Sequence, residues 1–228
     1  MKVIAHRGAS AEKSQNTMAA FERALEIGVD AIEMDLLLTR EGELVVRHDN
    51  LIKMDGTVRQ IGEMSLEEIA KFDVGTGERM PTLEAVFDRF HKKIPLVLDL
   101  KAWGIAAPLA KFLIKRSAAQ EIHLTSFLHA EISELSSLCP RVDRSVVMVA
   151  IPIPFESVFE AAQVRQVSLN RSTINEAVIH RLHEAKIQVW SYTVNWLEEA
   201  QRFKDWGMDG IFTDDPALMQ PLRSPVNP

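Results

Sequence analysis

Short apolar runs alternate with amphipathic segments along most of the chain. The runs predict strands at residues 3–5, 31–36, 95–100, 122–126, 145–149, 166–169, 187–193 and 210–213. Between them, apolar residues recur at helical spacing and predict helices near residues 17–27, 82–90, 104–117, 129–138, 155–164, 173–185 and 196–206. Alternating β and α units imply an α/β fold with a parallel sheet. Eight such strands favour a closed (β/α)₈ barrel, and a doubly wound open sheet is the alternative.

Several helix ends have their own signals. Gly28 is expected to end the first helix, because glycine readily adopts the left-handed conformation found after helix C-termini. Thr173 and Asn195 are expected to be N-caps, since their side-chain oxygens can accept from free backbone N–H groups. Gly207 is expected to end the last of these helices.

One connection is much longer than the others. Between residues 36 and 95 the sequence contains a hairpin turn at 39–42, a return run at 44–47 and a capping box at Ser65–Glu68. Long connections in compact domains are usually functional, and an insertion after a barrel strand lies on the catalytic face. We expect one domain over residues 1–228, with an insertion at residues 37–80.

Composition narrows the classes of function. The 228-residue chain has a net charge of −6 and no basic block, which argues against nucleic-acid binding. Cys139 is the single cysteine, so an intrachain disulfide is excluded and a buried thiol at a helix end is expected. No apolar run approaches the roughly 20 residues of a membrane span, and nothing resembles a signal peptide, so we expect a cytoplasmic protein.

Candidate chemistry begins where the early strands end. His6 and Arg7 follow the first strand, while Glu33 and Asp35 lie two positions apart on the second strand and therefore point to one face. Asp99 adds a third strand carboxylate. Buried like charges repel unless a cation lies between them, and such oxygen ligands suit Mg²⁺ or Ca²⁺. The alternative is that these carboxylates cap neighbouring elements or pair with arginine.

A lysine and a second histidine extend this set. Lys101 shares a face with Asp99, so it could bind a phosphate together with Arg7 or simply pair with Asp99. His48, followed by Asp49, ends the return run of the insertion. Phosphodiester cleavage needs a base for the incoming oxygen and an acid for the leaving oxygen, which two histidines can supply.

Other residues have plainer interpretations. Trp190, Tyr192 and Phe212 on the late strands are expected to fill the barrel, and one of them can form a wall of the pocket. The pair Asp214-Asp215 is interpreted as helix capping. Among the remaining histidines His123 is the one to watch, because it lies inside a strand.

Taken in order, the motifs resemble the glycerophosphodiester phosphodiesterases. The similarity runs from residue 3 to about residue 218 and rests on segments 4–8, 16–21, 32–35, 38–42, 45–49, 80–83, 192–195 and 207–216. It implies a TIM barrel with a small insertion after the second strand. It also implies hydrolysis of substrates such as glycerophosphocholine or glycerophosphoethanolamine to sn-glycerol 3-phosphate and an alcohol.

The resemblance also implies roles for individual residues. His6 and His48 correspond to the acid–base pair. Ligands of a divalent metal, Mg²⁺ or Ca²⁺, correspond to Glu33, Asp35 and Asp99. The residues at the positions that contact the phosphate or substrate are Arg7, Lys101 and Tyr192. The chain departs from the usual family pattern at Gln15 (often Glu), Asp99 (commonly Glu) and Tyr192 (usually Trp).

Two other functions fit the same residues. One is an enzyme of this fold that acts on lysophospholipids, which an apolar entrance at residues 50–80 would favour, although that segment is polar. The other is a catalytically silent barrel that binds a phosphorylated metabolite. A small-molecule glycerophosphodiester is the expected partner, and a homodimer is left open.

Overall fold

Eight parallel strands form a closed ring in the structure. A computed structural model describes residues 1–54, 56–75, 77–118 and 120–223. The ring order is β1-β11-β10-β9-β8-β7-β6-β2, and pairing of β1 with β2 closes it. The strands are β1 (Lys2–Ala5), β2 (Ala31–Leu38), β6 (Leu96–Leu100), β7 (Ile122–Ser126), β8 (Asp143–Met148), β9 (Gln166–Asn170), β10 (Gln188–Tyr192) and β11 (Gly210–Thr213).

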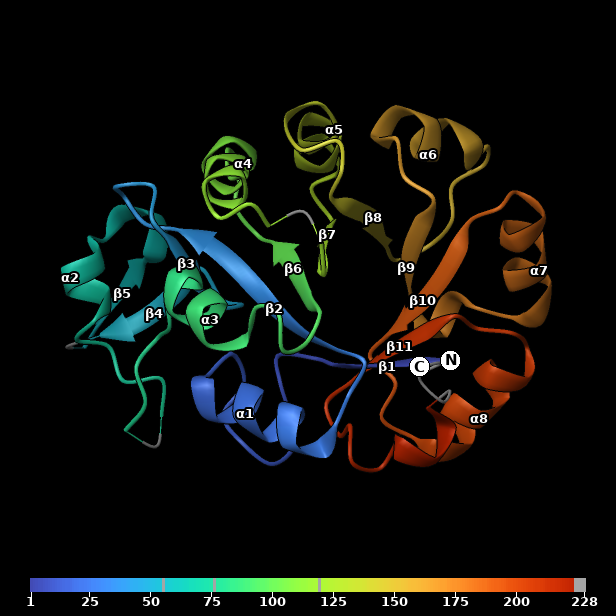
Figure 1. Cartoon of the computed structure of the whole chain (residues 1–228), viewed down its shortest axis with the longest axis horizontal. Coiled ribbons are helices and arrows are strands. Elements are labelled where there is room, and N and C mark those ends of the chain that lie inside the picture. Colours follow the sequence, from blue (N-terminus) through green and yellow to red (C-terminus); the bar gives the residue numbers. More distant parts are fainter. Residues whose placement is uncertain (55, 76, 119, 224–228) are drawn as a thin grey trace.

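Helices form an outer layer around this ring (Figure 1). They are α1 (Met18–Ile27), α3 (Leu83–Phe90), α4 (Ala106–Lys115), α5 (His129–Leu138), α6 (Glu156–Ala162), α7 (Glu176–Glu184) and α8 (Leu197–Asp205). The predicted TIM-type (β/α)₈ barrel is therefore confirmed, and the open-sheet alternative is wrong because β1 pairs on both of its edges. No helix within the described ranges has the length and apolar character needed to cross a membrane.

The segment between β2 and α3 carries additional structure. β3 (Leu44–Val46) returns antiparallel to β2, as the hairpin turn predicted. A separate two-stranded sheet of β4 (Leu51–Met54) and β5 (Thr57–Gln60) follows, then η1 (Ile61–Glu63) and α2 (Leu66–Ile69). The predicted capping box is present, since Glu68 N donates to Ser65 and Ser65 N donates to Glu68. A small core joins this segment to the end of β2 and consists of Leu37, Val45, Ile52, Ile61, Met64, Ile69 and Met80.

The predicted helix ends are partly correct. Gly28 has a φ of 81° and donates to Ala24 O and Leu25 O, so it ends α1 as expected. Gly207, at φ 86°, likewise follows α8. Thr173 is not the N-cap of α7, because Asn175 accepts from Val178 N and takes that role. The hydroxyl of Thr173 lies within hydrogen-bond distance of the backbone carbonyls of Val149 and Asn170 instead.

The barrel interior is apolar along the first part of the strands and polar toward their carboxyl ends. Ile4, Ala31, Val97, Trp190 and Phe212 pack together inside the ring, as expected for the aromatic residues of the late strands. Further along the same strands, inward positions change to charged and hydroxyl side chains. Active sites of such barrels lie at the carboxyl ends of the strands, and this change of chemistry marks that face here.

Candidate active site

A cavity of about 170 Å³ lies at the carboxyl ends of the barrel strands. Seven of the eight predicted site residues line it: His6, Arg7, Glu33, His48, Asp99, Lys101 and Tyr192. The eighth, Asp35, lies beside the cavity with 1% of its surface exposed, and contacts both Arg7 and Lys101. Sequence positions from 6 to 192 therefore converge on one small volume. Its other lining residues, which the sequence did not identify as a group, include Thr125, Phe127, Val147 and Ser168.

The turn after β1 is built to place Arg7. Arg7 has a φ of 59° and Gly8 a φ of 82°, so the chain turns through the left-handed region immediately after the strand. A side chain at Gly8 would meet Ala20 at 2.6–2.7 Å, which shows that glycine is needed for contact with α1. The turn directs the Arg7 N–H toward Glu33 Oε2, at 2.8 Å.

Three buried carboxylates form the base of the site. Ligand atoms of Glu33, Asp35 and Asp99 lie within 4.8 Å of one another. Asp35 and Asp99 are register partners on β2 and β6, which explains why residues 64 positions apart meet. Burial, and then the neighbouring carboxylates, raise the pKa of Glu33 well above its usual range. Burial likewise raises the pKa of Asp99 to about 6, although Lys101 opposes the shift.

Two cations partly balance these carboxylates. Lys101 Nζ lies 2.6 Å from Asp99 Oδ2 and 3.3 Å from Asp35 Oδ1. Arg7 Nε lies 2.9 Å from Asp35 Oδ2, an ion pair without the alignment of a hydrogen bond. Burial alone would raise the pKa of Asp35, but Lys101 and Arg7 outweigh it and lower that pKa. The sequence allowed Lys101 either to bind a phosphate or to pair with Asp99, and the structure contains the pairing with Asp99.

The carboxylate cluster suits a divalent cation. Asp35 Oδ1 and Asp99 Oδ1 are buried and accept no hydrogen bond from the part of the chain that the structure describes. Asp35 Oδ1 has the Lys101 ammonium 3.3 Å away, whereas Asp99 Oδ1 has no hydrogen-bond partner among the described residues, so the cluster leaves carboxylate oxygen free for a positively charged ligand. If all five groups are ionised, three negative charges face two positive ones, which leaves one negative charge for a cation to neutralise. An all-oxygen ligand set is the preference of Mg²⁺ or Ca²⁺.

Residues of the β1–α1 loop hold the side chains of Asp35 and Arg7 in place. Asn16 Nδ2 donates to Asp35 Oδ2 at 2.8 Å, and Asn16 Oδ1 accepts from Asp35 N at 3.2 Å. Gln15 Oε1 accepts from Arg7 at 2.5 Å, so the residue that departs from the family pattern retains a hydrogen bond without a charge. Asn16 was missed as a site residue, although its position inside a matched motif was the available signal.

Both predicted histidines have one ring nitrogen occupied by a carboxylate. His6 Nδ1 lies 2.6 Å from Asp214 Oδ1, and His48 Nδ1 lies 2.8 Å from Asp49 Oδ1. This leaves Nε2 of each ring as the nitrogen available for chemistry. The His6 side chain is 18% exposed and the His48 side chain 40%, so His6 is held more deeply in the protein.

The helix-capping interpretation of Asp214 is wrong. Asp214 accepts from His6, Ser10 and Asn195, which together fix its carboxylate beside the ring of His6. Burial would raise the pKa of Asp214, but the His6 hydrogen bond leads the opposing effects and lowers it to about 2. Asp215 accepts from Leu218 N within the turn that follows β11 and is not a helix cap either, because the N-cap of η3 (Gln220–Leu222) is Met219.

Asn195 also has a different role from the one predicted. It is not the N-cap of α8, which is Trp196. Its amide instead donates to Asp214 Oδ2 at 2.6 Å, and its oxygen accepts from Asp214 N at 2.9 Å. Asparagine often caps helices, but Asn195 orients the carboxylate of Asp214.

Tyr192 forms part of the cavity wall. Its hydroxyl donates to Met148 O at 3.1 Å, and burial is the main reason that its pKa is raised to about 12. Its ring meets Phe127 edge-on at a centroid distance of 5.8 Å. The hydroxyl is thus engaged with the backbone of β8, while the residue as a whole lines the cavity.

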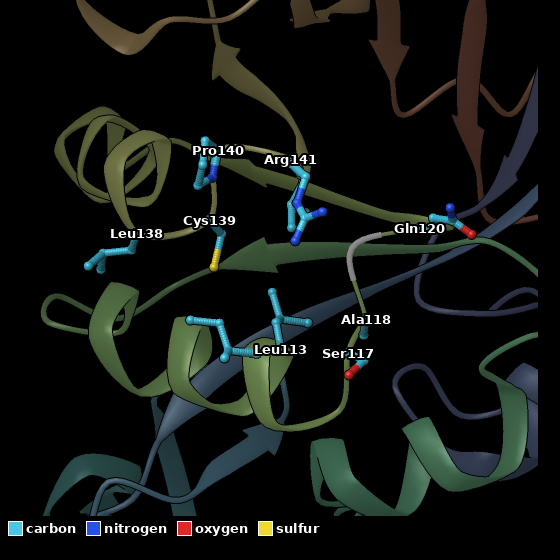
Figure 2. A pocket seen from close by; sticks show the side chains of 10 residues that line it. Leu113, Ser117, Ala118, Gln120, Leu138, Cys139, Pro140 and Arg141 are labelled. Carbon is cyan, nitrogen blue, oxygen red and sulfur yellow. The ribbon is translucent and has the colours of Figure 1, made fainter.

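A larger hollow, of about 610 Å³, lies between α4 and α5 and lacks comparable chemistry. Figure 2 shows Leu113, Leu138 and Pro140 around it, together with the Cys139 thiol. Among the described residues that line it, none is a histidine or a carboxylate. Cys139 ends α5 and is 6% exposed, and burial raises the pKa of its thiol, so the expected buried thiol at a helix end is confirmed.

Comparison with known proteins identifies the group to which this barrel belongs. A sequence model of the "Glycerophosphoryl diester phosphodiesterase family" matches residues 6–218. The chain belongs to the glycerophosphoryl diester phosphodiesterase family. The predictions of this family and of a phosphodiesterase are thereby confirmed. Residues 6–218 include every member of the predicted site.

Individual relatives agree with this membership. A glycerophosphodiester phosphodiesterase of Caldanaerobacter subterraneus is 32% identical over 236 residues, which cover 95% of this chain and 95% of that protein. The human lysophospholipase D GDPD1 is 25% identical, over 96% of this chain and 85% of its own length. The fold of an Oleispira antarctica phosphodiesterase, solved in complex with its product sn-glycerol-3-phosphate, superposes with a TM-score of 0.90 at 24% identity, covering 97% and 96% of the two chains.

Proposed function

We propose that this enzyme hydrolyses glycerophosphodiesters, such as glycerophosphocholine and glycerophosphoethanolamine, to sn-glycerol 3-phosphate and an alcohol. The observation that carries the proposal is the lining of one cavity by two histidines, two cations and the carboxylates Glu33 and Asp99. Family membership over residues 6–218 supports the same reaction class. The cavity of about 170 Å³ suits a phosphate with a small polyol, and leaves a larger alcohol to lie toward its mouth.

The histidines are proposed to share the two proton transfers. His6 and His48 each have Nδ1 beside a carboxylate, which favours a proton on Nδ1 and leaves Nε2 to accept or donate one at the substrate. One ring removes the proton of the attacking oxygen, and the other protonates the departing alkoxide. The order of the two roles is left open, as it was from the sequence.

Arg7 and Lys101 are proposed to bind the phosphate. The Lys101 ammonium has three N–H donors and uses one on Asp99 Oδ2, which leaves donors for a non-bridging oxygen. Arg7 points its Nε at Asp35 and another guanidinium nitrogen at Gln15, so its orientation is fixed before substrate arrives. Fixed donors of this kind stabilise developing charge without reorganisation.

Glu33, Asp35 and Asp99 are proposed to hold Mg²⁺ or Ca²⁺. Bound there, such an ion supplies Lewis-acid stabilisation of a phosphoryl oxygen, worth several kcal/mol in other enzymes. The Oδ1 atoms of Asp35 and Asp99, which accept no hydrogen bond from the described residues, support this assignment. Tyr192 is proposed to contact the substrate through its ring rather than its hydroxyl.

A release assay for sn-glycerol 3-phosphate tests the proposal. The purified protein is incubated with glycerophosphocholine, glycerophosphoethanolamine and a phosphomonoester, each with Mg²⁺, with Ca²⁺ or with a chelator. Release of sn-glycerol 3-phosphate from the diesters, without release of inorganic phosphate from the monoester, supports the proposal. Binding of glycerol phosphate without release from any diester supports the silent barrel instead.

Lysophospholipid hydrolysis is a second candidate with its own observation. The insertion is polar in composition but exposes Leu51 and Val58, and Phe127 lines the cavity and is 46% exposed. The name of the human relative, lysophospholipase D, points to the same substrates. Choline release from lysophosphatidylcholine, compared with choline release from glycerophosphocholine, decides between these substrates, because cleavage of the lysophospholipid leaves an acylated glycerol phosphate that the glycerol 3-phosphate assay does not detect. The single domain over residues 1–228, the cytoplasmic location and a homodimer stay predictions.

A further inference from the structure

Most exposed large apolar side chains lie around the mouth of the candidate active site. Ten such residues are found in the described part of the chain, and six lie in loops that follow barrel strands. We call these six the apolar rim: Trp103, Phe127, Val149, Ile153, Trp196 and Leu218. Parallel barrel strands all end on one face, so the apolar rim shares that face with the cavity.

The exposure of the apolar rim is large. Ile153 is 87% exposed, Trp103 70% and Trp196 65%, so these side chains stand in solvent at the loop tips. Single exposed apolar residues are ordinary on a protein surface, whereas their concentration around one opening marks an interaction surface. Exposed tryptophans are also the side chains best suited to the boundary between water and lipid.

The apolar rim is continuous with the reactive groups. Phe127 lines the cavity, and Lys101 Nζ lies 5.6 Å from the centroid of its ring. On another side, Trp196 borders an adjoining hollow of about 810 Å³ that also contains His6 and Arg7. Apolar side chains therefore border the site on two sides, with its cations between them.

Charged residues are absent from several loop segments of the apolar rim, while two cations lie inside the cavity. The loop segments 102–104, 127–128 and 149–155 contain no charged residue. Arg7 and Lys101 lie within the cavity that these loops surround, with side chains only 17% and 18% exposed. A phospholipid layer offers the complementary pattern, since its phosphodiester groups lie beside hydrocarbon at the water boundary.

We propose that the apolar rim docks on a zwitterionic phospholipid surface and holds the cavity mouth against it. A second copy of the chain seated on this rim would cover the opening between Phe127 and Trp196, whereas a lipid surface presents the phosphodiester chemistry that the cavity binds. The net charge of −6 favours a zwitterionic surface over an anionic one. The inference rests on the proposed function only for the phosphodiester chemistry of the ligand.

Flotation with vesicles tests the inference. The full chain is mixed with phosphatidylcholine vesicles, and the floated fraction is measured for wild type, for Trp103→Ser/Ile153→Ser and for Ile114→Ser. Ile114 is the matched control, because it is 66% exposed but lies on α4 away from the rim loops. The double variant should lose roughly tenfold or more in vesicle partitioning, and the control should bind like wild type.

Other outcomes overturn the inference without touching the proposed function. Neither Trp103 nor Ile153 lines the cavity, so turnover of soluble glycerophosphocholine should be unchanged and also reports that the variants are folded. If the wild type does not float, or if Ile114→Ser loses binding equally, the rim is not a lipid surface. If light scattering shows a dimer that Trp103→Ser/Ile153→Ser dissociates, the rim joins copies of the chain. If diester turnover is absent but flotation follows the rim variants, the proposed function fails while the docking surface stands.

Discussion

His6 Nδ1 lies 2.6 Å from Asp214 Oδ1, although 208 positions separate the two residues. The parallel register of β1 with β11 explains the contact. Ala5 lies opposite Thr213, and His6 and Asp214 are the residues that come directly after them. Asn195 and Ser10 hold the carboxylate from other directions. The pKa of Asp214, lowered to about 2, keeps it ionised at neutral pH, where it favours a proton on His6 Nδ1.

Replacement of Asp214 should therefore impair turnover through His6. Asp214→Asn keeps the shape of the side chain but can also donate to Nδ1, which favours the wrong tautomer. We expect kcat to fall roughly 10²-fold or more, with KM little changed. Steady-state kinetics on glycerophosphocholine provide the measurement. Asp215→Asn is the matched control, because Asp215 accepts from Leu218 N, and equal losses in both variants would contradict a role through His6.

Removal of either histidine should be at least as severe as replacement of Asp214. His6→Ala and His48→Ala each delete a proton-transfer group, so kcat should fall roughly 10²–10⁴-fold, with a much smaller change in KM. His180→Ala is a suitable control, since its side chain is 65% exposed on α7. Near-native turnover by both site variants would show that the two-histidine mechanism is wrong.

Divalent cations should stabilise the fold as well as restore activity. Chelation is expected to abolish diester hydrolysis, and added Mg²⁺ or Ca²⁺ to restore it, because the carboxylate cluster has oxygens that accept no hydrogen bond from the described residues. An ion that binds only the folded state also raises the melting temperature. Asp99→Asn should raise the cation concentration needed for both effects by roughly tenfold or more, by analogy with changes at other metal sites.

The control for the cation experiment is Asp143→Asn. This variant removes an exposed carboxylate at the start of β8, whereas the cavity lies at the carboxyl ends of the strands. It should leave the cation dependence of melting and activity unchanged. Full activity after exhaustive chelation, or melting temperatures that do not respond to either cation, would refute the metal assignment.

Much of the site was predictable because it lies on regular strands. Alternation along β2 places Glu33 and Asp35 on one face, and the parallel register with β6 brings Asp99 beside them. His6 and Arg7 were recognisable because they follow a strand at the end where barrel enzymes carry their chemistry. In these cases a local pattern was sufficient, since neighbouring strands in a barrel are related by simple geometry.

The misassigned residues depend on contacts that a local pattern does not contain. Asn195 and Asp214 were interpreted as caps because Asn and Asp favour caps in general, yet here their side chains bond to each other. The closure of the ring places β1 beside β11, and only that long-range pairing makes Asp214 a partner of His6. Asn175, rather than Thr173, caps α7 because the short η2 (Arg171–Thr173) delays the start of the helix.

His123 should make the folded state sensitive to acid. Its ring lies 5.2 Å from that of Trp190, and Nε2 lies 2.8 Å from Ser145 Oγ inside the barrel. Burial, with Lys2 and Arg144 nearby, lowers the pKa of His123 from 6.5 to about 3. The unfolded chain therefore binds a proton below pH 6.5 that the folded chain does not. Stability is fully present above that pH and should be lost as the pH falls toward about 3.

The comparison of wild type with His123→Gln isolates this effect. Glutamine can hydrogen-bond to Ser145 but does not titrate, so its free energy of unfolding should depend less on pH between 6.5 and about 3. The difference in slope should not exceed about 1.4 kcal/mol per pH unit, which is the value for one proton. Urea unfolding at a series of pH values provides the measurement, with His180→Gln as an exposed control. Parallel curves for wild type and His123→Gln would mean that His123 takes up its proton equally in both states. The acid sensitivity would then come from carboxylates whose pKa is lowered in the folded state, Asp35 and Asp214, because the raised pKa values of Glu33 and Asp99 act in the opposite direction.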